Sequence, residues 1–256
     1  MNTIEIQQMM NEQQTEQKMN ELEQMLLLIF SLLFLNLTSR LDPRMSVEKQ
    51  WRTLFLIINT EFRKIKKELP SGLSIIAKEL HESTLQMIQE QGIEITSRLT
   101  NKDIEQIIQK RIANLTLNDR IERNRKRFIV QLRDVLIQSK ERNETIEELS
   151  ERIRTLVTTH GNRIRLILRT EVHRIQNTII HDLAQKASRV DSRLKKTWVA
   201  VMDSRTRPAH RRLHGTTIPI KGLFKSTAGG IGPAPGLMGN PGDDINCRCR
   251  LRISIS

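Results

Sequence analysis

With 256 residues, the chain is long enough for one large or two small domains, each with its own core. Its 42 Lys and Arg exceed its 29 Asp and Glu, and its 28% charged and 38% hydrophobic residues are typical of a folded, helix-rich protein rather than a disordered one. The low aromatic content of 3% argues against nucleic-acid binding by base stacking, and a count of only two cysteines excludes a disulfide-stapled secreted scaffold.

The chain opens with an acidic segment followed by an apolar one. Residues 1–23 contain five Glu and one Lys, whereas a secretory signal peptide has a positively charged start. Residues 24–39 are uncharged, but they include polar side chains and are fewer than the roughly 18–20 apolar residues that span a bilayer. We therefore expect residues 1–44 to form an acidic tail and an apolar helix, Met25–Leu37, that docks on a partner. Burial in the chain's own core is the alternative, and membrane insertion is disfavoured.

Residues 45–190 have the three- and four-residue spacing of apolar side chains that is typical of amphipathic helices. Pro70 and Gly92 are expected to end helices, and Gly161 is expected to separate two others. Thr145 and Glu148 form a capping-box pattern that begins a helix. The apolar stripes fall in residues 45–69, 73–91, 104–115, 119–139, 146–159 and 162–187. These segments predict an elongated helical body.

The composition changes after about residue 192. Eight of the 11 glycines and five of the seven prolines lie beyond residue 207. Strands are expected at residues 196–202, with Trp198 on one face, and at 250–255, whereas residues 229–236 can only form a loop. The predicted fold is therefore mainly α: the helical body, residues 45–190, is followed by a small, loop-rich α+β C-terminal module, residues 191–256, which zinc could stabilise.

A metal cross-link would suit this module because its few aliphatic side chains make a marginal core. Cys247 and Cys249 are too close in sequence for an unstrained disulfide, which favours a thiolate role in a reducing compartment. With His210 they supply the ligand types that Zn²⁺ prefers. The alternative is that the cysteines are small buried side chains and the histidine bonds locally. A fourth ligand could come from Asp203, Asp244 or His214.

Two clusters of cationic side chains stand out, one in residues 120–133 and one in residues 189–212. Such clusters attract phosphate backbones through counterion release and do not read base sequence. A solvated protein surface is the alternative interpretation. The candidate DNA-binding residues are Arg120, Arg123, Arg125, Lys126, Arg127, Arg193, Lys195, Lys196, Arg205, Arg207, Arg211 and Arg212.

We expect no enzymatic activity. Asp203, His210 and the cysteines could be interpreted as a Cys–His pair, but a nucleophilic cysteine usually comes with a distinct pocket and an orienting third group. His173 and His181 lack the spacing of a metalloprotease helix.

The C-terminal motifs resemble the phage Mu F-like minor head protein family, also called phage head morphogenesis proteins. They are Thr197-Trp-Val-Ala200, Asp203-Ser-Arg-Thr-Arg-Pro-Ala-His210, His214-Gly215, Pro241 and Ile245-Asn-Cys-Arg-Cys249. Thr145–Ile153, Ile167-Leu-Arg-Thr-Glu171 and Asn177 resemble the helices that precede them in the family, so the resemblance covers roughly residues 140–256. Many members have cysteines at the positions of Arg207 and His210, and a histidine at that of Asp244. The resemblance thus implies that His210 replaces a ligand.

The resemblance also implies a virion protein of low copy number that lies inside the capsid near the portal and is present in the host cytoplasm during assembly. It would assist head assembly and DNA packaging or delivery. The implied partners are the portal protein, packaged double-stranded DNA bound without sequence specificity, and a major capsid or scaffolding protein. Two other functions remain open. One is a membrane-interacting protein that is ejected with the genome, and the other is a cytoplasmic, zinc-stabilised nucleic-acid-binding protein.

Overall fold

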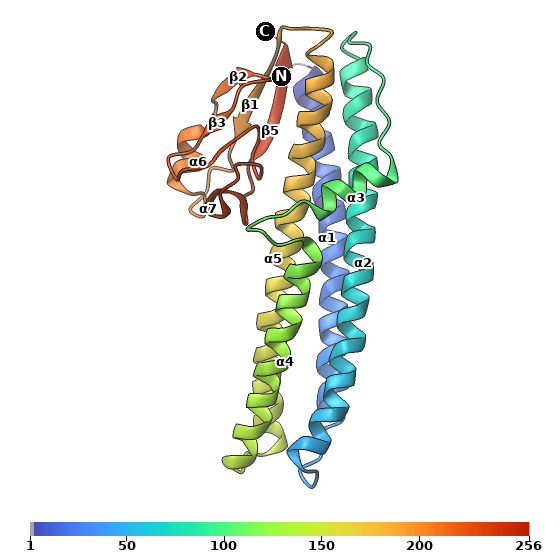
Figure 1. Cartoon of the computed structure of the whole chain (residues 1–256), viewed down its shortest axis with the longest axis vertical. Coiled ribbons are helices and arrows are strands. Elements are labelled where there is room, and N and C mark those ends of the chain that lie inside the picture. Colours follow the sequence, from blue (N-terminus) through green and yellow to red (C-terminus); the bar gives the residue numbers. More distant parts are fainter. Residues whose placement is uncertain (1–2, 256) are drawn as a thin grey trace. The chain divides into compact units, whose positions relative to one another are not determined.

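The computed structural model describes residues 3–255, and the chain forms two compact units that each combine distant segments. Unit 1 contains Met1–Asn20, Gly72–Thr116 and Arg169–Ser256, and unit 2 contains Glu21–Ser71 and Leu117–Leu168. The helices are α1 (Thr3–Thr38), α2 (Val47–Gln89), α3 (Asn101–Gln109), α4 (Leu117–Glu141), α5 (Ile146–Ala187), α6 (Pro208–Leu213) and α7 (Pro241–Asp244). Within residues 3–255 the strands occur only in the C-terminal part (Figure 1), so the predicted mainly α fold with a small α+β module is confirmed.

Unit 2 is built from four helical segments, which belong to α1, α2, α4 and α5 (Figure 1). One series of ring contacts runs through all four. The Phe62 ring lies 6.1 Å from the rings of both Phe30 and Phe128, and the Phe128 ring lies 5.1 Å edge-on from that of His160. Buried aliphatic residues such as Leu54, Ile58 and Ile65 extend this core at the three- and four-residue spacing read from the sequence.

Two helices continue where the sequence predicts breaks. Helix α2 runs through Pro70, although an interior proline costs roughly 3 kcal/mol, and the fully buried Leu69 and Leu73 flank it. Helix α5 runs through Gly161, where an added Cβ would lie 3.2 Å from Cγ of Phe30. The predicted breaks are wrong because, at Gly161, the missing side chain makes room for a core ring, and at Pro70 the burial of neighbouring leucines offsets the penalty.

The helix starts were predicted more accurately than the stops. Thr145 and Glu148 form the expected reciprocal capping bonds ahead of α5, at 2.8 and 3.2 Å. The apolar stripe of residues 104–115 is helical only to Gln109, because Ala113 and Asn114 have positive φ and turn the chain before α4.

The C-terminal module in unit 1 contains two antiparallel sheets. In the larger sheet, β1 (Leu194–Val199) lies between β2 (Thr217–Pro219) and β5 (Arg250–Ile255), and Trp198 faces Leu251 in the register. The smaller sheet pairs β3 (Phe224–Lys225) with β4 (Ile231–Gly232). Strand β5 therefore matches its predicted range, whereas β1 lies two to three residues earlier than predicted.

The start of α1 is bound to the last strand of the chain within unit 1. The Glu12 carboxylate accepts hydrogen bonds from Arg250 and Arg252 at 2.8 and 3.3 Å. The side-chain amide of Gln8 donates to the carbonyl oxygen of Ile253 at 3.0 Å. Acidic residues of the N-terminal segment are thus helical and paired with arginines of β5.

Candidate metal centre and binding surfaces

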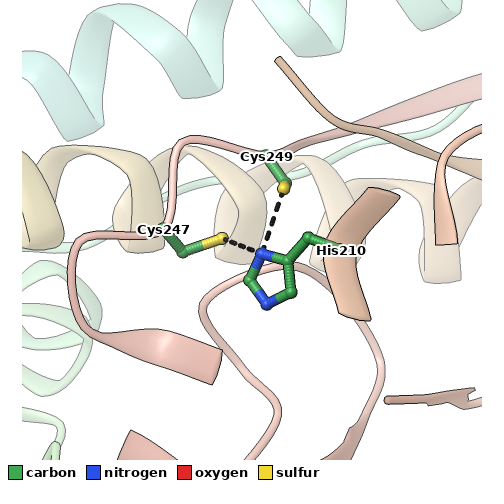
Figure 2. Close-up of side chains that lie close together, drawn as sticks. All are labelled: His210, Cys247 and Cys249. Atoms are coloured by element: carbon green, nitrogen blue, oxygen red, sulfur yellow. Dashed lines mark hydrogen bonds between the residues drawn. The ribbon is translucent and has the colours of Figure 1, made fainter. Parts of the chain in front are cut away.

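His210, Cys247 and Cys249 meet in the interior of the C-terminal module (Figure 2). His210 comes from α6, which begins at Pro208, a residue suited to the first helical turn. The cysteines lie in the segment between α7 and β5. Nδ1 of His210 is 3.7 Å from Sγ of Cys247 and 3.4 Å from Sγ of Cys249. We call these three buried residues the cysteine–histidine group.

The spacing within this group fits a zinc ion. Tetrahedral ligands with Zn–S of about 2.3 Å and Zn–N of about 2.1 Å place sulfur and nitrogen about 3.6 Å apart. The observed 3.7 and 3.4 Å lie on either side of that value. Two thiolates and one imidazole are also a donor set that zinc accepts. Among the described residues the group offers three ligands, one fewer than most structural zinc sites have.

The hydrogen bond between the two thiols shifts their pKa values in opposite directions. The contact with Cys247 lowers the pKa of Cys249, with further help from Trp198, Arg207 and Arg248, against the effect of burial. The same contact raises the pKa of Cys247, and burial adds to the rise. Burial alone would lower the pKa of His210, but its contacts with Cys247 and Asp243 outweigh burial and raise it. The thiolate is therefore favoured at Cys249.

The structure does not bring the predicted fourth ligands to this group. Both oxygens of Asp203 accept hydrogen bonds from Arg248, at 2.6 and 2.7 Å, and this pairing holds the pKa of Asp203 well below its usual range. Oδ1 of Asp244 accepts the backbone N–H of Met238 at 2.8 Å. Nδ1 of His214 accepts the backbone N–H of Ala200. Each of these three side chains thus makes hydrogen bonds elsewhere in the module.

Sequence reasoning missed the carboxylate that does touch the group. Oδ1 of Asp243 lies 3.1 Å from Nε2 of His210, on the side of the ring away from the sulfurs. No sequence signal separates Asp243 from its neighbour Asp244, because the two adjacent carboxylates differ only in which loop donors they accept.

Two α5 residues that resemble the family's motif, Thr170 and Asn177, bind the loops of the module. The Asn177 amide donates to the carbonyl oxygens of Pro235 and Cys249 and accepts the N–H of Leu251. Thr170 accepts the N–H of Asn246, two residues before the Arg-Cys end of the motif. These contacts are structural, and they fix the backbone on either side of the cysteines.

The burial of Lys196 contradicts its predicted role in DNA binding. Lys196 is 0% exposed. Side chains alternate between the two faces of β1, so Lys196 lies on the same covered face as Trp198. Its ammonium group lies over the Phe224 ring. A side chain in that position cannot contact a phosphate backbone. The alternation of the predicted strand already indicated this face.

The other cations differ in what they bind. Arg123, Lys126 and Arg127 are exposed at helical spacing on α4, and we call them the cationic stripe. Lys195 and Arg212 are also exposed. The remaining predicted residues take part in contacts within the chain: Arg120, Arg125, Arg193, Arg205, Arg207 and Arg211.

A largely apolar groove lies between α1 and α5 in unit 2 and has a volume of about 470 Å³. Leu27 and Leu35, which are 40% and 57% exposed, line it together with buried Phe30. Arg154 and Arg165 are its charged lining residues, and the lining contains no acidic side chain. Helix α1 is also the one described helix, over Ile6–Thr38, that contains an 18-residue window apolar enough for a membrane span, with a mean hydropathy of 1.5 for that window.

Comparison with known proteins gives two relatives. Residues 130–252 match the model of the phage Mu protein F-like family. The chain is 34% identical over 148 residues to minor head protein GP7 of Bacillus phage SPP1, a match that covers 58% of this chain and 48% of that protein. It is 25% identical over 162 residues to NAD(+)–arginine ADP-ribosyltransferase EFV of Enterococcus faecalis, covering 63% of this chain and 33% of that protein. The matches thus span less than half of either relative's length. No solved structure matches.

Proposed function

We propose that this chain, whose residues 130–252 match the model of the phage Mu F-like family, is a minor head protein that associates with the portal inside the capsid and assists head assembly and DNA packaging or delivery. The observation that carries the proposal is the match to an SPP1 minor head protein. The family-like region also contains the whole cysteine–histidine group. A head component of this kind has a structural role, and we propose no enzymatic activity for it.

The test is sedimentation of the full chain with heads. We expect the chain to travel with DNA-filled heads and with empty heads, and to be lost from heads assembled without a portal. Retention on portal-less heads at the same level would contradict portal association. Absence from all heads would contradict the head-protein function itself.

We propose that the α1–α5 groove receives a helix of the portal protein. The wall from Arg154 to Arg165 is about 16 Å long, which is the length of three helical turns. Its apolar lining suits the apolar face of an amphipathic helix. Both charged lining residues are arginines that already pair with glutamates of this chain, Arg154 with Glu151 and Arg165 with Glu23, so the apolar lining is the part that would recognise the incoming helix.

The groove is tested by a double variant in the full chain, Leu27→Gln with Leu35→Gln. We expect at least a tenfold drop in binding to portal-containing heads. The matched control, Leu56→Gln with Val130→Gln, alters exposed apolar residues of unit 2 that do not line the groove, and should bind as the parent does. Undiminished binding by the groove variant would overturn this assignment. Flotation of the parent chain with lipid vesicles would instead favour a bilayer as the partner of α1.

We propose that the exposed cations contact packaged DNA. The cationic stripe presents three charges on one helical face. Such charges would contact DNA phosphates, and phosphate contacts carry no sequence information. Replacing Arg123, Lys126 and Arg127 with Gln should lower the slope of log affinity against log salt by about 2.7, at about 0.9 for each lost contact. A charge-matched control replaces the exposed Arg40, Lys49 and Lys78. Absence of duplex binding at about 50 mM salt, or binding insensitive to salt, would contradict this role.

We propose that the cysteine–histidine group binds zinc and thereby cross-links α6 to the segment before β5. When bound, the ion would supply a structural tie and no chemistry of its own. The purified chain should contain one zinc per molecule, and Cys247→Ser should abolish this content and lower the melting temperature. Since the chain has only two cysteines, thiol reagents report directly on both ligands, which zinc should protect. Metal-free protein with two reactive thiols would refute the zinc site.

A further inference from the structure

We propose that Asp243 is the positioning residue of the cysteine–histidine group: it orients the His210 ring so that Nδ1 faces both sulfurs. The inference rests on the proposed zinc site and adds a role for a residue outside its ligands. Asp243 is not among the fourth ligands expected from the sequence, which are its neighbour Asp244 and two other residues.

The two ring nitrogens of His210 have different surroundings. Nδ1 lies within 3.7 Å of both sulfurs, whereas Nε2 lies 3.1 Å from Oδ1 of Asp243. A carboxylate can only accept a hydrogen bond here, so the ring proton belongs on Nε2. The lone pair of Nδ1 is then free for a metal ion. Figure 2 shows this nitrogen pointing toward Cys247 and Cys249. Carboxylates often hold metal-binding histidines in this way.

Asp243 is itself held in place by several donors. It is 0% exposed, its Oδ1 accepts the hydroxyl of Ser226 at 2.8 Å, and its Oδ2 accepts the N–H of Gly230 at 3.1 Å. At Gly230 an added Cβ would lie 2.3 Å from Oδ2 of Asp243, so only glycine allows this approach. The carboxylate therefore has donors on both oxygens, which offsets the cost of its burial and leaves it little freedom to turn.

The ring of His210 is constrained on another side by Trp198. The two rings meet edge to face with centroids 5.4 Å apart. Rotation of the imidazole about its long axis would require both this contact and the hydrogen bond to Asp243 to break. The group is thus preorganised by residues from β1, from the loop between β3 and β4, and from α7.

The experiment compares Asp243→Asn with Asp244→Asn in the full chain. Asp244 is the matched control because it is adjacent and buried but accepts a backbone N–H away from the group. Zinc affinity is measured by competition with a chromogenic chelator. Loss of the carboxylate that supports a histidine ligand typically weakens metal binding 10–100-fold. We expect a loss in that range for Asp243→Asn and less than a threefold change for Asp244→Asn.

A second measurement does not depend on whether a variant folds. In the zinc-bound parent chain, nitrogen NMR of the His210 ring should show the proton on Nε2 and the metal on Nδ1. Metal on Nε2, or equal zinc affinity for Asp243→Asn and the parent, would overturn the role of Asp243 while leaving the zinc site intact. A parent chain that binds no zinc would refute the site itself, together with the role of Asp243 toward it.

Discussion

The interior of the four-helix unit 2 and the interior of the C-terminal module are stabilised by different kinds of contact. In unit 2, rings and aliphatic side chains from four helices form the core, which also contains the hydrogen-bonded pair His160 and Asn124. The module is stabilised by buried side chains that bind its loop backbone: Asn177 of α5 contacts Pro235, Cys249 and Leu251, and Asp243 of α7 contacts Gly230. A periodic apolar core tolerates many exchanges of similar residues, whereas a hydrogen-bonded loop core requires particular atoms at particular places.

The largest loss of stability is expected when an aromatic ring is removed from the core of unit 2. Phe62 is fully buried between Phe30 and Phe128, so Phe62→Ala should reduce the free energy of unfolding by about 3–5 kcal/mol. Urea denaturation measures this loss. The control, Phe55→Ala, alters a side chain that is 36% exposed and should cost much less. Equal losses for the two variants would show that the ring series is not the core of unit 2.

The corresponding change for the module removes the α5 side-chain amide that binds its loops. Asn177→Ala leaves two carbonyl oxygens and one N–H without their partner in a buried site, which should cost about 3 kcal/mol. Hydrogen–deuterium exchange should rise in β5 and in residues 233–237 but not in α4. Asn162→Ala, at an exposed position of the same helix, is the control. Exchange that rises equally in α4 would argue against the local role of Asn177.

Acid should weaken both units, and unit 1 more strongly. Burial lowers the pKa of His160 in unit 2, and of His173 and His181 in unit 1, to about 4. These histidines protonate near 6.5 in the unfolded chain, so the unfolded state holds more protons between pH 6.5 and 4. Their contribution to stability is thus complete above pH 6.5 and falls as the pH drops toward 4.

Melting at pH 7, 5 and 4 measures this effect. His160→Gln should flatten the pH dependence of the free energy of unfolding by about 1–2 kcal/mol over this window. Stability that stays constant from pH 7 to 4 would contradict a neutral buried His160.

The smallest expected effect lies at Gly161. Alanine favours a helix over glycine by about 1 kcal/mol, but its Cβ would lie 3.2 Å from the Phe30 ring. The two effects oppose each other, so Gly161→Ala should change the free energy of unfolding by less than about 1 kcal/mol. Gly92→Ala should instead be clearly destabilising because Gly92 has a φ of +76°. A large loss at Gly161 would show that the ring cannot shift.

The sequence predicts these two regions unequally, for a physical reason. Helix stripes and the strand at residues 250–255 follow from local periodicity, which a single segment carries by itself. The continuation of α2 through Pro70 and of α5 through Gly161 depends on packing that periodicity does not encode. The cysteine–histidine group could be assembled from ligand chemistry alone. Its supporting carboxylate could not, because the choice between Asp243 and Asp244 depends on which loop amides reach each oxygen.

The bonds from Glu12 to Arg250 and from Gln8 to Ile253 join residues 238 and 245 positions apart. During translation the first helix is made long before its partner strand, so these bonds of unit 1 can form only after residue 253 has been synthesised. Truncation after residue 249 would remove β5, so it should leave the start of α1 without these partners and the chain prone to aggregate.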